Sequence, residues 1–302
     1  MPSKEQFLTD IRSDNVEQRF AAWRSAAEME ANIIPDLGKI AATASSPGVA
    51  KAAREAMQTL VNSLGKEPSP KRAEAVRELL ALASGHAPVP LRGLAFRLLS
   101  LIAGEDSVPA IAKWLTHAEL GEEAAFCLER IPGASAIQAL TAAYRNVNDS
   151  FKPRILAALG HRRAAEAAPI CVEAMRSPNR DIALAAAKAY ARIGKKSAVA
   201  VRWPDPAPLP EWQKLEHADS LLRFADAQRE EGNHAEAMRL YKQMLTRPEP
   251  HLQCAAVIGI ARIGTGEAAA AIFPMLQSKN RRVRITAEKA WNGMARSAAA
   301  KA

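Results

Sequence analysis

The repeat that decides the fold is clearest in two stretches of the chain. Residues 177–201 read SPNRDIALAAAKAYARIGKKSAVAV, and residues 248–276 read PEPHLQCAAVIGIARIGTGEAAAAIFPML. In both, a loop with proline precedes an apolar-periodic helix that ends at a glycine, and the pieces YARIG and IARIG align Gly194 with Gly264. Glycine ends helices because it tolerates the left-handed backbone conformation. We therefore expect one helix before each of these glycines and a second helix after a short turn.

The same arrangement of loop, helix, glycine and second helix recurs along most of the chain. Copies that diverge further from the clearest pair lie at residues 15–42, 89–115 and 151–175. The stretch at 279–295 matches only the first helix of the pattern, so we expect it to end the array. A single hairpin of this kind cannot bury its own apolar face, and stacking on its neighbours supplies the missing core.

Composition favours the same fold. The chain of 302 residues contains 64 Ala but only 18 Phe, Trp, Tyr and Cys residues together. Alanine is the strongest helix former, whereas sheets favour β-branched and aromatic side chains. Pro35, Pro109 and Pro169 stand where a second helix begins, a position in which proline loses no hydrogen bond. We predict an all-α fold: a right-handed α-solenoid of stacked antiparallel helix hairpins.

The helix starts and ends resemble the HEAT repeat, in the short bacterial form named after the phycobilisome lyases. The resemblance is carried by Val283, Arg284 and Ala287 at a helix start, by the Ile-Gly pairs that end helices, and by the prolines described above. It covers most of the chain. The resemblance implies an armadillo-type superhelix whose concave surface holds a partner.

One segment departs from this pattern. WPDPAPLP at 203–210 holds four prolines, which stop a helix and keep the backbone extended, and we expect Trp203 and Trp212 to pin it to the solenoid. The stretch 217–245 resembles a tetratricopeptide hairpin, with a Glu-Gly-Asn turn and then an Ala-x-x-x-Tyr pattern. We therefore divide the continuous solenoid into an N-terminal HEAT-like array at 1–202, a proline-rich linker at 203–212, the tetratricopeptide-like hairpin at 213–247, and C-terminal HEAT-like repeats with a capping helix at 248–302.

Motifs that carry chemistry are missing from the sequence. None of the six His residues is followed by another four positions later, and no His-Glu dipeptide, GxSxG, GxxxxGKS or GxGxxG sequence occurs. Cys127, Cys171 and Cys254 are isolated, and we expect them to be small buried hydrophobes. We expect no catalytic residue, no metal site and no cofactor. An enzyme on a HEAT scaffold, resembling a bilin lyase or an alkylpurine DNA glycosylase, stays as an alternative.

Positive charge is concentrated in the C-terminal half. Residues 1–150 carry 16 Lys and Arg against 18 Asp and Glu, whereas residues 151–302 carry 25 against 14. Stacking is expected to align the basic groups near the helix starts into one ridge. This candidate binding ridge consists of Lys152, Arg154, Arg176, Arg180, Lys195, Lys196, Lys279, Arg281, Arg282 and Arg284. An arginine at the start of a HEAT helix also has a structural explanation, because it pairs with acids of the adjacent repeat.

These features favour a non-catalytic scaffold or adaptor that binds a protein, acidic in charge, through its concave surface. Nucleic-acid binding through the basic half is the second hypothesis, because clustered Lys and Arg can contact phosphates. The N-terminal stretch lacks the apolar segment of a signal peptide, and no window is apolar enough to span a membrane. We expect a cytoplasmic monomer that does not bind a membrane.

Overall fold

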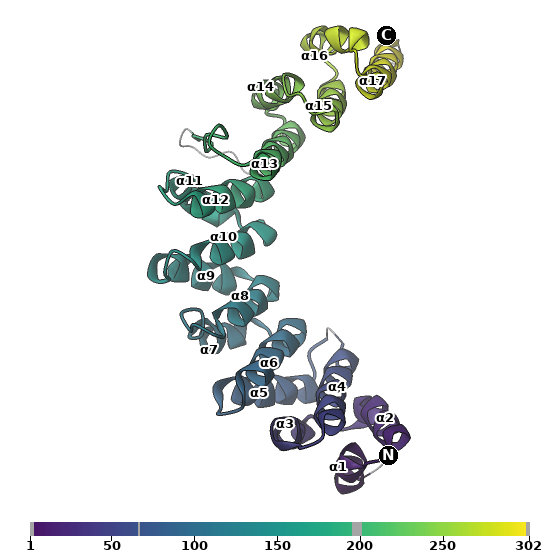
Figure 1. Ribbon diagram of the computed structural model, residues 1–302, viewed down its shortest axis with the longest axis vertical. Coiled ribbons are helices and arrows are strands. Elements are labelled where there is room, and N and C mark those ends of the chain that lie inside the picture. Colours follow the sequence, from purple (N-terminus) through teal and green to yellow (C-terminus); the bar gives the residue numbers. More distant parts are fainter. Residues whose placement is uncertain (1–2, 66, 195–200, 300–302) are drawn as a thin grey trace. The chain divides into compact units, whose positions relative to one another are not determined.

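The computed structural model describes residues 3–65, 67–194 and 201–299, and within them it contains α-helices, short 3₁₀ segments and no strand. Helices, the 3₁₀ segments included, account for 77% of the described residues, and they pack on neighbouring helices (Figure 1). This all-α, solenoid-like arrangement confirms the predicted fold class. The contacts divide the chain into two units, Met1–Ala158 and Leu159–Ala302, which are described separately below.

The described residues of the first unit form nine complete helices. They are α1 (Lys4–Arg12), α2 (Val16–Arg24), α3 (Ile34–Thr43), α4 (Pro47–Ser63), α5 (Pro70–Ser84), α6 (Val89–Ile102), α7 (Val108–Ala112), α8 (Gly121–Arg130) and α9 (Ala134–Asn146). Helix α10 (Lys152–His161) crosses the boundary between the units.

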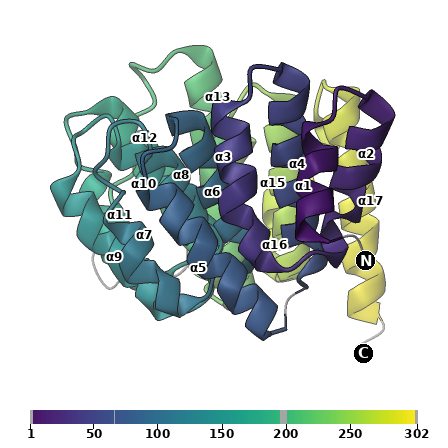
Figure 2. The same cartoon turned by 90° about the horizontal axis from the view of Figure 1, so that it is seen from below.

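Within the first unit the helices stack in two rows. In one row α2 packs on α4, α4 on α6 and α6 on α8; in the other, α1 packs on α3, α3 on α5 and α7 on α9. In Figure 1, α7 and α9 lie to the left of α6 and α8. Figure 2 shows α1, α3 and α4 running roughly side by side. Each helix therefore buries its apolar face against both the next repeat and the other row.

In the part of the second unit that the structure describes there are seven further helices. They are α11 (Ala168–Ala174), α12 (Arg180–Ile193), α13 (Glu211–Glu230), α14 (His234–Leu245), α15 (Pro250–Ile263), α16 (Gly266–Ile272) and α17 (Arg281–Ala299). One row runs α12, α13, α15, α17, because α12 packs on α13, α13 on α15 and α15 on α17. The remaining helices pack on this row. Helix α11 packs on α12, α14 packs on α13 and α15, and α16 packs on α15 and α17.

The helix ends predicted from the repeat are confirmed. Gly194 and Gly264 close α12 and α15, and both have a left-handed backbone with φ of 72°. Pro35, Pro109 and Pro169 each stand in the first turn of a helix, in α3, α7 and α11. Short 3₁₀ segments lead into those three helices, at Ala31–Ile33, Glu105–Ser107 and Ala165–Ala167. The repeat therefore fixes local geometry as well as spacing.

Helices α2, α12 and α17 begin with the same local structure. An asparagine caps each helix by accepting hydrogen bonds from the backbone N–H groups two and three residues later, at 2.9 to 3.4 Å. A serine two positions earlier accepts a hydrogen bond from the N–H of that asparagine. The pairs are Ser13–Asn15, Ser177–Asn179 and Ser278–Asn280. In α2 and α17, Arg19 and Arg284 also donate to the serine carbonyl oxygen, at 2.5 and 2.8 Å.

The proline-rich segment after residue 200 lies against α13. The Trp203 ring contacts the rings of Phe224, His217 and Tyr190, with centroids 5.6 to 6.0 Å apart. Trp203 therefore pins the linker as predicted. The same prediction is wrong for Trp212, which is 61% exposed. The buried face of α13 begins one residue later, at Gln213, and successive helix residues point about 100° apart.

The three cysteines Cys127, Cys171 and Cys254 are buried and free, as predicted. Burial in apolar surroundings raises the pKa of the Cys127 and Cys171 thiols to about 12. Both side chains therefore act as small hydrophobes at neutral pH.

Candidate protein-binding groove

Two residues of the predicted basic ridge, Lys152 and Arg154, belong to the first unit, and both bind acids there. The Lys152 Nζ lies 2.8 Å from an oxygen of Asp149, and this hydrogen bond raises the lysine pKa. Arg154 is mostly buried and pairs with Glu129 at 2.8 Å and Glu122 at 3.2 Å. Arg154 therefore joins α10 to α8, so its charge is used within the fold.

In the second unit the basic residues fall into two groups. Arg176 and Arg180 are exposed around the start of α12, while Lys279, Arg281 and Arg282 are exposed around the start of α17. Arg284 is instead used in the cap of α17 described above. Lys195 and Lys196 lie outside the described residues.

The two basic groups are separated by helices that begin with acids. Glu211 opens α13, and Glu249 stands at the N-cap position of α15 and pairs with Arg247 at 2.6 Å. Since α13 and α15 stand between α12 and α17 in the row, positive charge is interrupted along this edge of the second unit.

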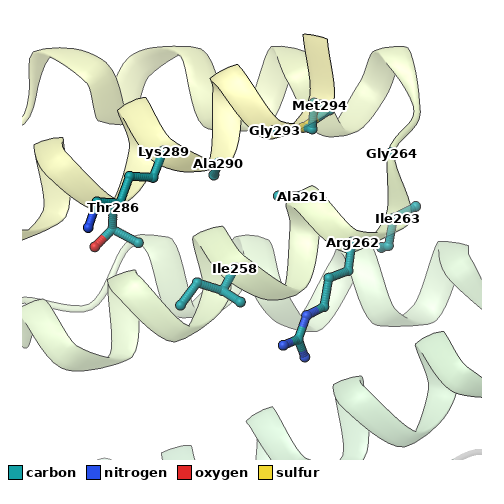
Figure 3. A pocket seen from close by; sticks show the side chains of 10 residues that line it. All are labelled: Ile258, Ala261, Arg262, Ile263, Gly264, Thr286, Lys289, Ala290, Gly293 and Met294. Atoms are coloured by element: carbon teal, nitrogen blue, oxygen red, sulfur yellow. The ribbon is translucent and has the colours of Figure 1, made fainter. Parts of the chain in front are cut away.

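A groove runs between α15 and α17, with a volume of about 880 Å³. Its lining consists of Ile258, Ala261, Arg262, Ile263 and Gly264 from α15 and its cap, and Thr286, Lys289, Ala290, Gly293 and Met294 from α17. Figure 3 shows Ala261 facing Ala290 and Gly293 across the groove. These residues are small, so no side chain fills the space beside them. Ile258 is 44% exposed on its edge.

The charged residues that line the α15/α17 groove, Arg262 and Lys289, are both positive. Arg262 and Lys289 are exposed, and no acid stands among the lining residues. Residues 250–302 carry eight Lys and Arg against two Asp and Glu. One of those acids, Glu267, is already paired with Lys242 at 2.7 Å. The groove therefore combines an apolar floor with a basic rim.

A second groove stands two steps earlier in the row, between α12 and α13, and encloses about 460 Å³. It is lined by Ala191, Arg192, Ile193 and Gly194 at the end of α12, by Arg223, Asp226, Ala227, Glu230 and Glu231 of α13 and its cap, and by Arg163. The Ala-Arg-Ile-Gly sequence at the end of α12 recurs 70 residues later at the end of α15. The facing residues likewise correspond at a distance of 63 residues, so that Asp226, Glu230 and Glu231 of the first groove become Lys289, Gly293 and Met294 in the second.

The acids of the α12/α13 groove are held by neighbouring groups. Asp226 accepts a hydrogen bond of 2.6 Å from the Tyr241 hydroxyl, and Arg229 lies 3.0 Å from Glu230. Burial and the bond to Asp226 raise the pKa of Tyr241, so its hydroxyl stays a donor. Buried Gln228 donates to the Gly194 carbonyl oxygen at 2.7 Å and ties α13 to the end of α12.

Sequence reasoning found the aligned glycines at the ends of α12 and α15 but missed the groove beside them. The missed residues are on the facing helix, at Lys289, Gly293 and Met294. The one signal that could have found them is Gly293, since a glycine inside a helix weakens it and calls for a reason.

The described residues hold no group of three or more His, Cys, Asp or Glu side chains placed to share a metal ion. No helix within the described ranges is long and apolar enough to cross a membrane.

Comparison with known proteins leaves the chain without a family assignment. No protein-family model matches the sequence, and no curated protein matches it. One solved structure with a similar chain course is the crystal structure of an engineered protein, a structural-genomics target. It shares 20% sequence identity, with a TM-score of 0.42 over 98% of this chain and 89% of that one.

Proposed function

We propose that the protein is a non-catalytic scaffold or adaptor of HEAT-like repeats with one tetratricopeptide-like hairpin, α13–α14, and that it binds a protein partner through the α15/α17 groove. The observation that carries the proposal is the groove itself, with its apolar floor, its exposed Ile258 and a rim that offers only positive charge. An apolar concavity with a few convergent charges is the usual form of a binding site.

Nucleic-acid binding is less well supported. Phosphate recognition by a repeat protein needs basic residues along a continuous track. In the row of the second unit, Glu211 and Glu249 stand between the exposed basic groups of α12 and α17. An apolar floor also offers nothing to a phosphate backbone.

The test is site-specific photo-crosslinking in the cells from which the chain comes. A photoreactive phenylalanine analogue replaces Ile258 in the α15/α17 groove, and in a matched variant it replaces Lys188, which stands at the equivalent position of α12. Protein adducts that form at position 258 and are absent at position 188, identified by mass spectrometry, are the expected result. Adducts to nucleic acid at position 258, equal protein adducts at both positions, or no adduct at 258 contradict the proposed function.

A further inference from the structure

We propose that the α15/α17 groove binds an acidic amphipathic helix, whose carboxylates supply from the partner the negative charge that α13 supplies within the chain in the α12/α13 groove. This inference rests on the proposed function and names the class of partner.

The first argument is charge complementarity between two matched grooves. The lining of the α12/α13 groove holds three arginines and also three acids, Asp226, Glu230 and Glu231, all on α13 and its cap. In the α15/α17 groove the cations Arg262 and Lys289 remain, while no lining residue is acidic. A partner that brings carboxylates to this rim completes the pattern that the chain satisfies internally in the α12/α13 groove.

The second argument is the shape of the groove. Its lining on α17 extends from residue 286 to residue 294, and at 1.5 Å per residue this is about 12 Å, or two turns of a helix. Ile258 and Met294 provide apolar contacts, and the small residues between the helices leave room for a partner's larger side chains. A helix suits such a floor because it satisfies its own backbone hydrogen bonds, whereas an extended peptide here meets no strand edge to pair with.

The third argument is Gly293, which lies well inside α17. A Cβ atom built on this residue has no other atom within 4 Å, so packing gives no reason for a glycine here. Helix propensity disfavours glycine at such a position. A side chain at 293 would project into the groove, and its absence keeps the groove open.

The experiment measures binding of a synthetic helical probe to the full chain. The probe is a labelled peptide of about five helical turns, with Leu at i, i+3, i+4 and i+7 spacing and Glu on both flanks of the apolar face. A second peptide has Lys in place of every Glu, and a third has the same composition as the first in scrambled order. Fluorescence anisotropy at low and high salt gives the affinities.

The decisive variant transplants the residues of α13 onto α17: K289D, G293E and M294E together. All three positions lie at least partly exposed to solvent, and glutamate favours a helix more than glycine does, so the variant is expected to fold. A matched control, E230Q with E231Q, alters the α12/α13 groove instead. Circular dichroism and thermal unfolding verify that both variants keep the wild-type helix content.

Binding of the acidic peptide in the micromolar range, at least tenfold weaker in the transplant variant and unchanged in the control, is the expected result. The basic and scrambled peptides are expected to bind at least tenfold more weakly than the acidic one. Equal affinity for acidic and basic peptides, or undiminished binding by the folded transplant variant, overturns the inference. Self-association of the wild-type chain that the transplant abolishes also overturns it, in favour of a second copy as the occupant.

Failure of this inference can be told apart from failure of the proposed function. If position 258 crosslinks to a protein but the acidic peptide does not bind, the groove is a protein site with another kind of partner. If position 258 gives no protein adduct either, both proposals are wrong.

Discussion

The α12/α13 and α15/α17 grooves share one frame and differ in what lines it. The ends of α12 and α15 have the same Ala-Arg-Ile-Gly sequence and the same left-handed glycine. The difference lies on the facing helix, where Asp226 and Glu230 of α13 are replaced by Lys289 and Gly293 of α17. The comparison teaches that the repeat fixes how the end of one helix packs. The residues of the next helix then decide whether the groove contains acids of its own or, as we propose, receives them from a partner.

Helices α13 and α15, one from each groove, are linked through Tyr241 of α14. Its hydroxyl binds Asp226 in the first groove, and its ring lies where a Cβ at Gly259 of α15 would have to be. Helix α15 can therefore pack closely on α14 only because residue 259 has no side chain.

The largest effect on stability is expected from Gly259→Ala. The added methyl collides with the Tyr241 ring, and overpacking of this kind costs about 1–3 kcal/mol of unfolding free energy. Urea unfolding followed by circular dichroism measures the loss. The control is Tyr241→Phe, alone and combined with Gly259→Ala. Phenylalanine keeps the ring that the new methyl group meets but lacks the hydroxyl that binds Asp226, so the control separates the collision from the loss of the hydrogen bond. A fully stable Gly259→Ala variant would show that α13 and α15 are not linked through this contact.

The next effect is a loss of stability in acid that is specific to α13. His217 is only 5% exposed, and its pKa is lowered by burial and then by the charge of Arg247. Below its ordinary pKa of about 6.5 the unfolded chain takes up a proton that the folded protein resists, so stability falls by at most about 1.4 kcal/mol per pH unit. This stability is present above pH 6.5 and is lost as the pH falls from there towards the lowered pKa.

Hydrogen exchange checks this prediction at pH 7.5 and pH 5.5. Amides of α13 are expected to exchange relatively faster at the lower pH, after correction for intrinsic rates, while those of α17 stay unchanged. In His217→Gln the difference should disappear. If the amides of α13 and α17 exchanged faster by the same factor at pH 5.5, the predicted difference between the two helices would be wrong.

A smaller effect of the opposite sign is expected from Gly293→Ala. A helix gains up to about 1 kcal/mol when an interior glycine becomes alanine, and no atom stands in the way of the new methyl group. Thermal and urea unfolding should both show a more stable protein. Destabilisation by this substitution would mean that Gly293 serves the fold of α17 instead of the open groove.

The smallest effect is expected from Lys188→Ala, which removes an ion pair between α12 and α13. Lys188 and Glu216 lie 2.6 Å apart, but their side chains are 41% and 44% exposed. Such surface pairs contribute about 0–1 kcal/mol, and the unfolding free energy should fall by less than about 0.5 kcal/mol. A loss well above 1 kcal/mol in urea unfolding would show that this ion pair between α12 and α13 holds the two helices together.

Features set by local sequence could be predicted, and features set by distant neighbours could not. Gly194, Gly264 and Pro35 specify their own backbone conformation, so their helix ends and starts were readable from the sequence. Trp212 was misread because its exposure depends on which face of α13 packs against the repeat. For Arg154 the sequence offered both a place in the basic ridge and pairing with acids of the adjacent repeat, and only the stacking of α8 and α10 identifies its partners, Glu122 and Glu129, 32 and 25 positions away.

The groove was hidden for a related reason. Its character depends on which residues of α17 face the end of α15, and that alignment is fixed only when the helices stack. In the sequence, Lys289, Gly293 and Met294 read as ordinary surface positions of a last helix. Their contrast with Asp226, Glu230 and Glu231 emerges once α13 and α17 are seen to occupy equivalent places in the row.

The Ser-x-Asn caps that start α2, α12 and α17 have a consequence for how such an array can grow. Every hydrogen bond of the cap joins residues no more than six positions apart, so each of these helices carries its own starting instructions. A duplication or deletion whose ends fall at two such caps therefore leaves an intact cap at the junction. The array can therefore gain or lose whole repeats while every helix at a junction keeps its N-cap. In each new repeat, the residues that line the groove can then be substituted.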